Sequence, residues 1–183
     1  IKLSLPFRRL TYTEAMEKFK SDKPDLRKNP GDFEILWVVD FPLFKYNEEE
    51  KRWDSEHHPF TSPNEEDITL LESKDLSKIR ARSYDLVING VELGSGSIRI
   101  HKKDIQRRIF EILGLEKSEI EERFGFLLKA FEFGAPPHGG FAFGLDRLVA
   151  MLLGADTIRD TIAFTKTQKG ICPLSGAPST VKG

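Results

Sequence analysis

Residues 139–148 constrain the fold more than any other stretch of the chain; they read Gly-Gly-Phe-Ala-Phe-Gly-Leu-Asp-Arg-Leu. Small and aromatic residues alternate up to Gly144, which is typical of a strand, and the apolar run that follows is typical of a helix. Asp146 can cap this helix through the free amides of its first turn. Arg147 then lies at a strand-to-helix junction, where its planar guanidinium can bind a phosphate. An ordinary surface ion pair of Arg147 is the alternative.

Composition sets broad limits on the class of protein. The 183 residues are 39% hydrophobic with a net charge of −1, which suits one domain with a core and argues against a surface that coats nucleic acid. The single cysteine, Cys172, cannot form an internal disulfide and indicates a reducing compartment. No apolar run is long enough for a membrane span and no signal peptide is visible, so we expect a cytoplasmic protein without a membrane partner. Because the chain begins with Ile1, we interpret it as a fragment.

The remaining patterns predict an α+β domain, an antiparallel sheet flanked by helices. Thr11 and Glu14 have the spacing of a capping box, and Ser62 to Glu65 has the pattern of a second helix start. The apolar run 33–40 predicts a central strand buried on both faces. No phosphate-binding loop or dinucleotide fingerprint is present in the sequence. We also predict a hairpin over 44–53, helices over 12–20, 104–113 and 118–133, a helix or turn and then a strand over 156–164, and a loop from 165 onwards.

Asn89-Gly90 predicts a tight hairpin that brings two carboxylates together. In a two-residue loop Val87 faces Glu92 and Leu86 faces Leu93. Asp85 then lies diagonally from Glu92, roughly 7–8 Å away at the backbone. Such a pair can hold Mg²⁺ together with the phosphates of a nucleotide. Two solvated carboxylates on an amphipathic hairpin are the alternative.

Arg99 lies seven positions after Glu92, so in a regular strand the two side chains would point to opposite faces. A slip of one residue would correct this, and Gly94-Ser95-Gly96 is where we predict a bulge or break. An arginine buried among apolar neighbours suits a carboxylate ligand, with a structural ion pair as the alternative.

Two further observations bear on the chemistry of the site. His57-His58-Pro59-Phe60-Thr61 precedes the expected second helix, and a histidine of this loop can close over a substrate or lie on the surface. No activated nucleophile is evident. Cations, a carboxylate pair and a backbone cradle favour positioning of phosphoryl or adenylyl groups over nucleophilic catalysis.

Together these residues resemble the bacterial-type aspartyl-tRNA synthetases, which are class II enzymes. Residues 134–148 resemble the third class motif, which other class II enzymes share in part. Four more segments discriminate better, and their order also matches: 21–27 (Ser-Asp-Lys-Pro-Asp-Leu-Arg), 57–61, 84–90 and 97–101. The resemblance covers nearly the whole chain and implies a partial class II catalytic domain over residues 1–183.

The resemblance implies an aspartate–tRNA ligase that uses ATP and Mg²⁺. Aspartate would be activated to aspartyl-adenylate and then passed to the acceptor end of tRNA. Arg147, Glu92 and Arg99 would be the catalytic residues. Arg99 and His57 would bind L-aspartate, with Arg99 selecting it over asparagine, and Asp85 and Glu92 would bind the metal. The residues that would bind ATP are Glu92, Gly144, Leu145, Asp146 and Arg147.

Several parts of the family pattern are absent from this sequence. We find no anticodon-binding domain, no first or second class motif, and no inserted domain between about residues 27 and 33. Arg8, Ser95 and Thr165 also replace residues that are usual in the family. A homodimer and the complete reaction are therefore implied for the parent enzyme. The alternatives are a non-catalytic module and an amino-acid-activating paralogue that does not act on tRNA.

Overall fold

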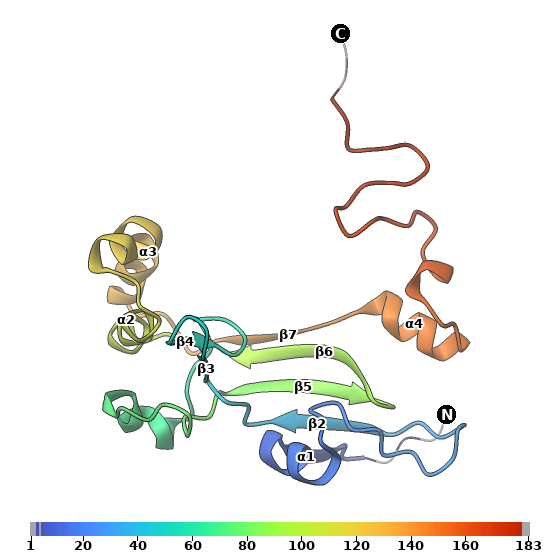
Figure 1. Ribbon diagram of the computed structural model, residues 1–183, viewed down its shortest axis with the longest axis horizontal. Helices are drawn as coiled ribbons and strands as arrows, with labels where there is room; N and C mark the ends of the chain where they lie inside the picture. The colour runs from blue at the N-terminus through green and yellow to red at the C-terminus, as the bar shows by residue number, and fades with distance from the viewer. Residues whose placement is uncertain (1–2, 4, 181–183) are drawn as a thin grey trace. The chain divides into compact units, whose positions relative to one another are not determined.

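The computed structural model describes residue 3 and residues 5–180. The chain divides into two units, residues 1–142 and 143–183, and each is described by itself (Figure 1). Within this described part, none of the helices has the length and apolar character of a membrane span.

A five-stranded sheet forms the first unit, with its last strand reaching the boundary. Its order is β1 (Arg8–Thr11), β2 (Ile35–Val39), β5 (Ser83–Ile88), β6 (Val91–Ile98) and β7 (Gly139–Phe143). The pairs β2–β5 and β5–β6 are antiparallel, as predicted, but β1 and β2 are parallel. The expectation of an antiparallel sheet was therefore wrong for the β1–β2 pair. Helix α1 (Tyr12–Phe19) follows β1 directly and provides the crossover that a parallel pair requires.

Strand β2 is fully buried on one face only. Leu36 and Val38 are 0% exposed, whereas the alternate residues are partly exposed, so burial on both faces was wrong. On the buried face, α1 starts with the predicted capping box of Thr11 and Glu14. On the other face, the ring of Trp37 packs edge-on against aromatic rings of β5 and β7 instead of a covering helix. The cluster on the α1 face is Leu10, Ala15, Leu36, Val38, Phe41 and Val87.

The predicted hairpin is confirmed as β3 (Phe44–Asn47) and β4 (Arg52–Ser55), but the next helix differs from its prediction. The segment Glu65–Glu72 is a 3₁₀ helix (η1) preceded by Asn64, and Ser62 does not cap it. The hydroxyl of Ser62, the group that would cap a helix, donates to the carbonyl of Pro63, and its amide donates to Ile98. The side chain of Asn64, which precedes the helix, donates to Asp40. Contacts with distant residues therefore override a local capping signal.

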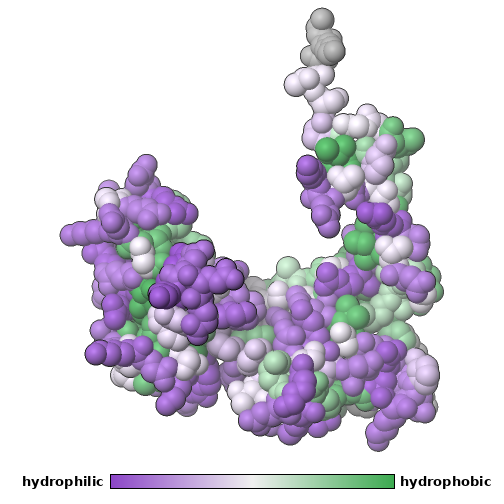
Figure 2. Space-filling model, in the orientation of Figure 1, coloured by the Kyte–Doolittle hydropathy of each residue, from purple (hydrophilic) through white to green (hydrophobic). Residues whose placement is uncertain are grey.

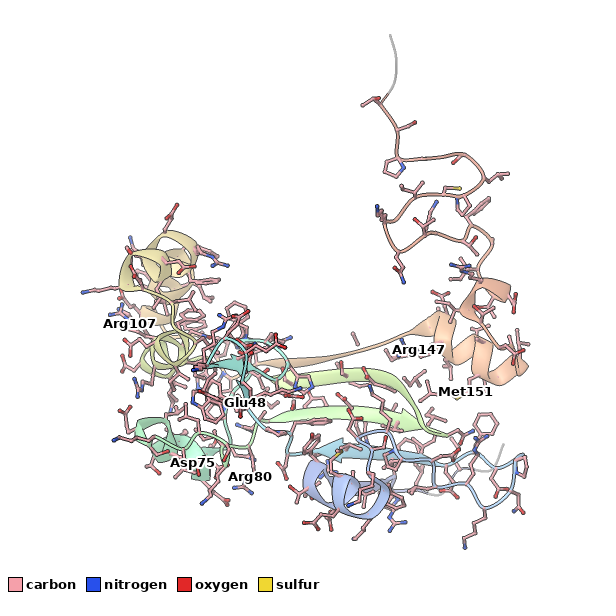
Figure 3. The ribbon with its side chains drawn as sticks, viewed as in Figure 1. Glu48, Asp75, Arg80, Arg107, Arg147 and Met151 are labelled. Atoms are coloured by element: carbon pink, nitrogen blue, oxygen red, sulfur yellow. The ribbon has the colours of Figure 1, made fainter. Side chains whose placement is uncertain are left out.

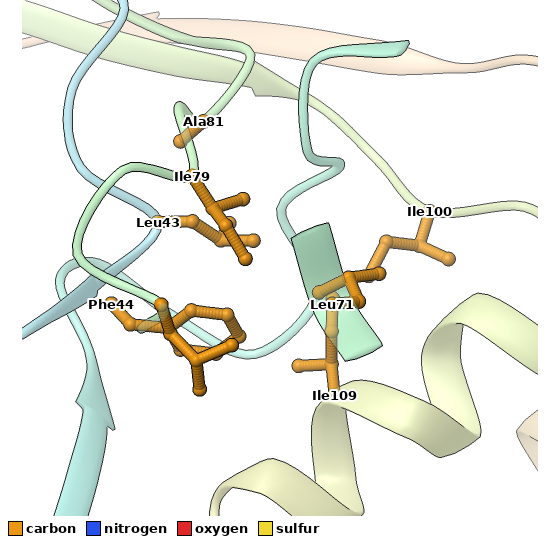
Figure 4. Packing of buried hydrophobic residues seen from close by; sticks show 8 residues of the cluster. Leu43, Phe44, Leu71, Ile79, Ala81, Ile100 and Ile109 are labelled. Carbon is orange, nitrogen blue, oxygen red and sulfur yellow. The ribbon is translucent and has the colours of Figure 1, made fainter. Parts of the chain in front are cut away.

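Helices α2 (Lys103–Ile112) and α3 (Lys117–Glu132) confirm the two predicted helices and pack against each other. Gly114 and Gly134 follow them with positive φ of 80° and 87°, values that favour glycine. One core cluster joins α2 to η1 and to the chain before β5 (Figure 4); its buried members are Leu43, Phe44, Leu71, Leu76, Ile79, Ala81, Ile100 and Ile109.

The second unit contains α4 (Leu145–Leu153) and a short 3₁₀ helix, Ile158–Asp160. Gly144 is the N-cap of α4 and Asp146 lies inside its first turn, so the predicted capping by Asp146 was wrong. A carboxylate in the first turn still interacts favourably with the helix dipole. In this described part, residues 156–164 contain no strand, and 165–180 form the predicted loop. Figure 2 shows hydrophobic atoms on the visible surface of this unit, and Leu153 is 72% exposed.

Candidate functional site

A one-residue bulge in β6 determines which side chains share a face. Val87 pairs with Glu92 as predicted, but Leu86 pairs with Gly94, so Leu93 is the extra residue. The predicted slip exists but lies one residue before Gly94-Ser95-Gly96, and β6 continues without a break to Ile98. The predicted pairing of Leu86 with Leu93 was wrong, since Leu86 pairs with Gly94 and the buried Leu93 is the bulge residue.

The bulge places polar residues of β5 and β6 on one face of the sheet. Ser95 lies opposite Asp85 and Ser97 lies opposite Ser83. Opposite residues of an antiparallel pair share a face, and so do alternate residues of a strand. This face therefore carries the carboxylates of Asp85 and Glu92. If the same alternation continues past Ser97, Arg99 belongs to this face as well. The slip that Arg99 required is thus supplied by Leu93.

Asp85 is a buried carboxyl with an unpaired oxygen. It is 4% exposed, and its Oδ1 has no hydrogen-bond partner among the described residues. Burial first, and then the negative charges of Glu92 and Asp22, raise the pKa of Asp85 to about 7. The hydroxyls of Ser83 and Ser97 on the same face are also buried and unpaired. Unpaired buried oxygens carry a desolvation cost that a bound cation or hydrogen-bond donor would remove.

Lys23 is a member of the site that sequence reasoning missed. Its Nζ lies 3.2 Å from Oε2 of Glu92, and this contact raises the pKa of Lys23. The lysine belongs to the segment 21–27, whose pattern was recognised but to which no role was assigned. Only the folded chain brings this segment, which follows α1, to the β5–β6 hairpin.

Arg99 is held between two loops. Its amide donates to the carbonyl of His138, and it forms a β-bridge with Thr61. This bridge places the loop that contains His58 next to Arg99, and the imidazole ring of His58 contacts the Arg99 guanidinium. His57, the predicted aspartate contact, instead packs edge-on against Phe41 with ring centroids 5.0 Å apart. The structure therefore brings His58, and not His57, to Arg99.

A cavity of about 560 Å³ opens beside this arginine. His58, Arg99 and His138 supply its polar groups, and Leu127 and Phe131 of α3 supply apolar lining. Gln106 also lines it, with a side-chain oxygen that has no partner. The cavity combines a cation with mostly apolar walls, an arrangement that binds a small anionic ligand.

The carboxylate pair is a candidate metal site. Among the residues that the structure describes, no three His, Cys, Asp or Glu side chains gather as a ready metal site. Mg²⁺ commonly binds one or two carboxylates and completes its shell with water and substrate phosphates. Asp85, with its unpaired oxygen, and Glu92 fit that pattern. They do not fit a metal held by protein ligands alone.

The remaining predicted residues lie in the second unit. Gly144, Leu145, Asp146 and Arg147 form the start of α4, and Figure 3 labels Arg147 on this helix. The Arg147 side chain is exposed. The free amides at the start of a helix attract anions, and an arginine in the first turn adds a second attraction for phosphate.

Comparison with known proteins identifies the family. The model of the class II tRNA synthetases (D, K and N) matches residues 1–168. The chain belongs to this family.

Curated relatives within the class II family are close in sequence but much longer. The aspartate–tRNA ligase of Pseudothermotoga lettingae is 59% identical over 157 residues, which are 86% of this chain and 26% of the relative. The aspartate–tRNA(Asp/Asn) ligase of Dictyoglomus turgidum is 58% identical over the same shares. The chain therefore spans about a quarter of the length of these relatives.

Solved structures confirm the class II synthetase fold. The aspartyl-tRNA synthetase of Entamoeba histolytica matches with a TM-score of 0.62 at 24% identity, over 92% of this chain and 33% of that chain. An asparaginyl-tRNA synthetase from the same organism, in complex with asparaginyl-adenylate, matches with a TM-score of 0.57 at 23% identity, over 88% and 36%. The predicted α+β class with a helix-flanked sheet is thus confirmed for this class II chain, apart from the parallel β1–β2 pair.

The contact between His58 and Arg99 predicts a pH response. The Phe60 amide donates to Nδ1 of His58 over 3.2 Å. Burial first, and then the charges of Arg99 and His57, lower the pKa of His58 below 6.5. We expect NMR titration of the imidazole to show a midpoint below 6.5. The unfolded chain then binds the proton more readily, so the stability due to the neutral ring is present above pH 6.5 and is lost as the pH falls through the folded pKa.

Replacing Arg99 with methionine should move this midpoint upward, because the repelling charge is removed. A His58 midpoint at or above 6.5 in the unchanged chain would contradict the contact, since it would place an anion rather than a guanidinium beside the ring.

Proposed function

We propose that this chain is part of the catalytic domain of an aspartate–tRNA ligase and carries its binding sites for L-aspartate and ATP. One observation supports this most: the Leu93 bulge shifts the alternation of β6 so that Arg99 follows on the same face as Asp85 and Glu92. Arg99 also lines a cavity. The names of the close relatives agree with this assignment.

In this proposal Arg99 binds the side-chain carboxylate of aspartate. A guanidinium pairs with a carboxylate through two parallel hydrogen bonds, which the neutral amide of asparagine cannot reproduce. The α-carboxylate of aspartate then remains free to attack the α-phosphorus of ATP, which releases pyrophosphate and forms aspartyl-adenylate. In the full-length enzyme the aspartyl group passes to the acceptor end of tRNA.

The remaining roles follow from charge. Arg147, with the backbone of Gly144, Leu145 and Asp146, binds the phosphates of ATP. Glu92 and Asp85 would hold Mg²⁺, which would neutralise phosphate charge when bound together with ATP. The chain's own contribution is to orient two anionic substrates that would otherwise repel each other.

We propose that a longer, cytoplasmic and homodimeric enzyme carries out both steps of this reaction. This chain would be one part of its catalytic domain. We propose that an anticodon-binding domain belongs to this longer enzyme, and that the short connection over residues 27–33 takes the place of the domain inserted in the bacterial type. The single cysteine agrees with a reducing compartment.

Calorimetry with a non-hydrolysable aspartyl-adenylate analogue and Mg²⁺ tests the proposal, with the asparaginyl analogue as the matched control. We expect the aspartyl analogue to bind about 100-fold more tightly, because the other leaves the Arg99 charge without its partner. Equal binding of the two analogues would contradict the role of Arg99 in selection. Absence of binding by a chain with native circular dichroism would contradict the assignment of both substrate sites to this chain.

A further inference from the structure

Lys23 lies at the centre of a cluster of acidic groups. Its Nζ is 3.2 Å from Oε2 of Glu92 and 3.9 Å from Oδ2 of Asp22. Asp85, buried on the same face as Glu92, interacts electrostatically with this ammonium group as well. One lysine therefore faces three carboxylates, two of which form the proposed metal site.

The backbone of this segment packs closely on the β5–β6 hairpin. A methyl group on Gly90 would lie 3.2 Å from Cβ of Asp25 and 3.7 Å from the carbonyl oxygen of Lys23. Pro24 between them is buried. The Lys23 side chain itself is 40% exposed, so its ammonium group can turn into solvent on its flexible stem. The lysine is thus placed against the carboxylates but is not locked there.

We propose that Lys23 is a resident counter-ion of the Asp85–Glu92 pair, which Mg²⁺ entering with ATP displaces. The inference rests on the proposed function in one respect, that these two carboxylates are the metal ligands. It adds a competing cation from the chain itself and links metal loading to the contact between segment 21–27 and the hairpin.

Electrostatic repulsion favours this displacement. Two neighbouring carboxylates repel each other, and the ammonium group reduces that repulsion while the metal is absent. A divalent cation bound to Glu92 would repel Lys23 at a few ångströms, so both cations cannot contact this carboxylate at full strength. The metal must therefore displace the lysine, and removal of the lysine should strengthen metal binding.

Binding of Mn²⁺ measured by electron paramagnetic resonance tests this competition, with Mn²⁺ alone and with Mn²⁺ plus ATP. We expect Lys23→Met to bind Mn²⁺ about 10-fold more tightly than the unchanged chain. The matched control is Lys18→Met, which removes a lysine paired with Glu14 at 3.7 Å on α1. Lys18 is not among the charges that act on Asp85, which are those of Glu92, Asp22 and Lys23. This control should leave Mn²⁺ affinity unchanged.

Hydrogen exchange provides a second readout that needs no variant. Mn²⁺ with ATP should speed amide exchange in residues 21–27 of the unchanged chain, because the Lys23–Glu92 contact is lost. Binding that is equal or weaker in Lys23→Met, or exchange that does not change, would overturn the role of Lys23. Mn²⁺ binding that persists undiminished in Asp85→Asn and Glu92→Gln would instead overturn the proposed metal site, so the two failures are distinguishable.

Discussion

Replacing Arg99 with alanine is expected to weaken binding of the aspartyl-adenylate analogue by more than 100-fold. Loss of one partner from a hydrogen-bonded, desolvated charge pair typically costs about 2–5 kcal/mol, and each 1.4 kcal/mol is tenfold in affinity. Arg99 lines the cavity together with His58, and no other arginine or lysine lines it in the described residues. Calorimetry of the variant and the unchanged chain measures the loss directly.

Two further variants separate charge from geometry. Arg99→Lys keeps the charge but loses the planar pair of donors, so we expect only partial recovery of affinity. Arg52→Ala removes an exposed arginine of the β3–β4 hairpin and should leave affinity unchanged. Aspartyl-analogue affinity that stays within a few-fold in Arg99→Ala would show that another group binds the substrate carboxylate.

Replacing Gly96 with alanine is expected to destabilise the chain by about 3 kcal/mol, at the upper end of overpacking effects. An added Cβ would lie 2.2 Å from the carbonyl oxygen of Gly140 and 2.5 Å from Cε2 of Tyr84. Rotation of a side chain cannot relieve a clash with backbone, so β7 must move away from β6. The hydrogen bond from the Tyr84 hydroxyl to the same Gly140 carbonyl, 3.0 Å long, would be strained as well.

Urea unfolding followed by tryptophan fluorescence measures this effect. Trp37 reports on the region because its ring contacts those of Tyr84 and Phe141. Gly140→Ala is the matched control, since an added Cβ there meets nothing within 4 Å. Equal unfolding midpoints for the two variants would show that β7 does not pack on β6 as closely as the structure places it.

The close approach at Gly96 and the bulge at Leu93 build different parts of the same strand. The bulge shifts the alternation so that Asp85, Glu92 and Arg99 fall on one face of the sheet. The missing side chain of Gly96 allows β7 to approach β6. Ser95, which lies between them, faces Asp85 across the pair. Strand β6 therefore serves the site through its backbone as much as through its charged side chains.

Signals that act within a few residues could be read from the sequence alone. The capping box of Thr11 and Glu14 forms as predicted because both partners lie within one turn of α1. The Asn89-Gly90 hairpin forms because both residues accept the positive φ that such a turn requires, 52° and 81°. The pairing of Val87 with Glu92, and with it the proximity of the two carboxylates, follows from that turn. The turn therefore places the Asp85–Glu92 pair of the candidate site.

Tertiary structure decided the features whose partners are distant in sequence. Ser62 has a good capping pattern, but the helix begins after Asn64, whose side chain donates to Asp40 instead of capping it. Leu93, rather than one of the neighbouring glycines, is the bulge residue, and its side chain is buried. His58 reached Arg99 and Lys23 reached Glu92 through packing of separate segments. Local propensities are small next to the free energy of burial and of long-range hydrogen bonds, so such contacts exist only in the folded chain.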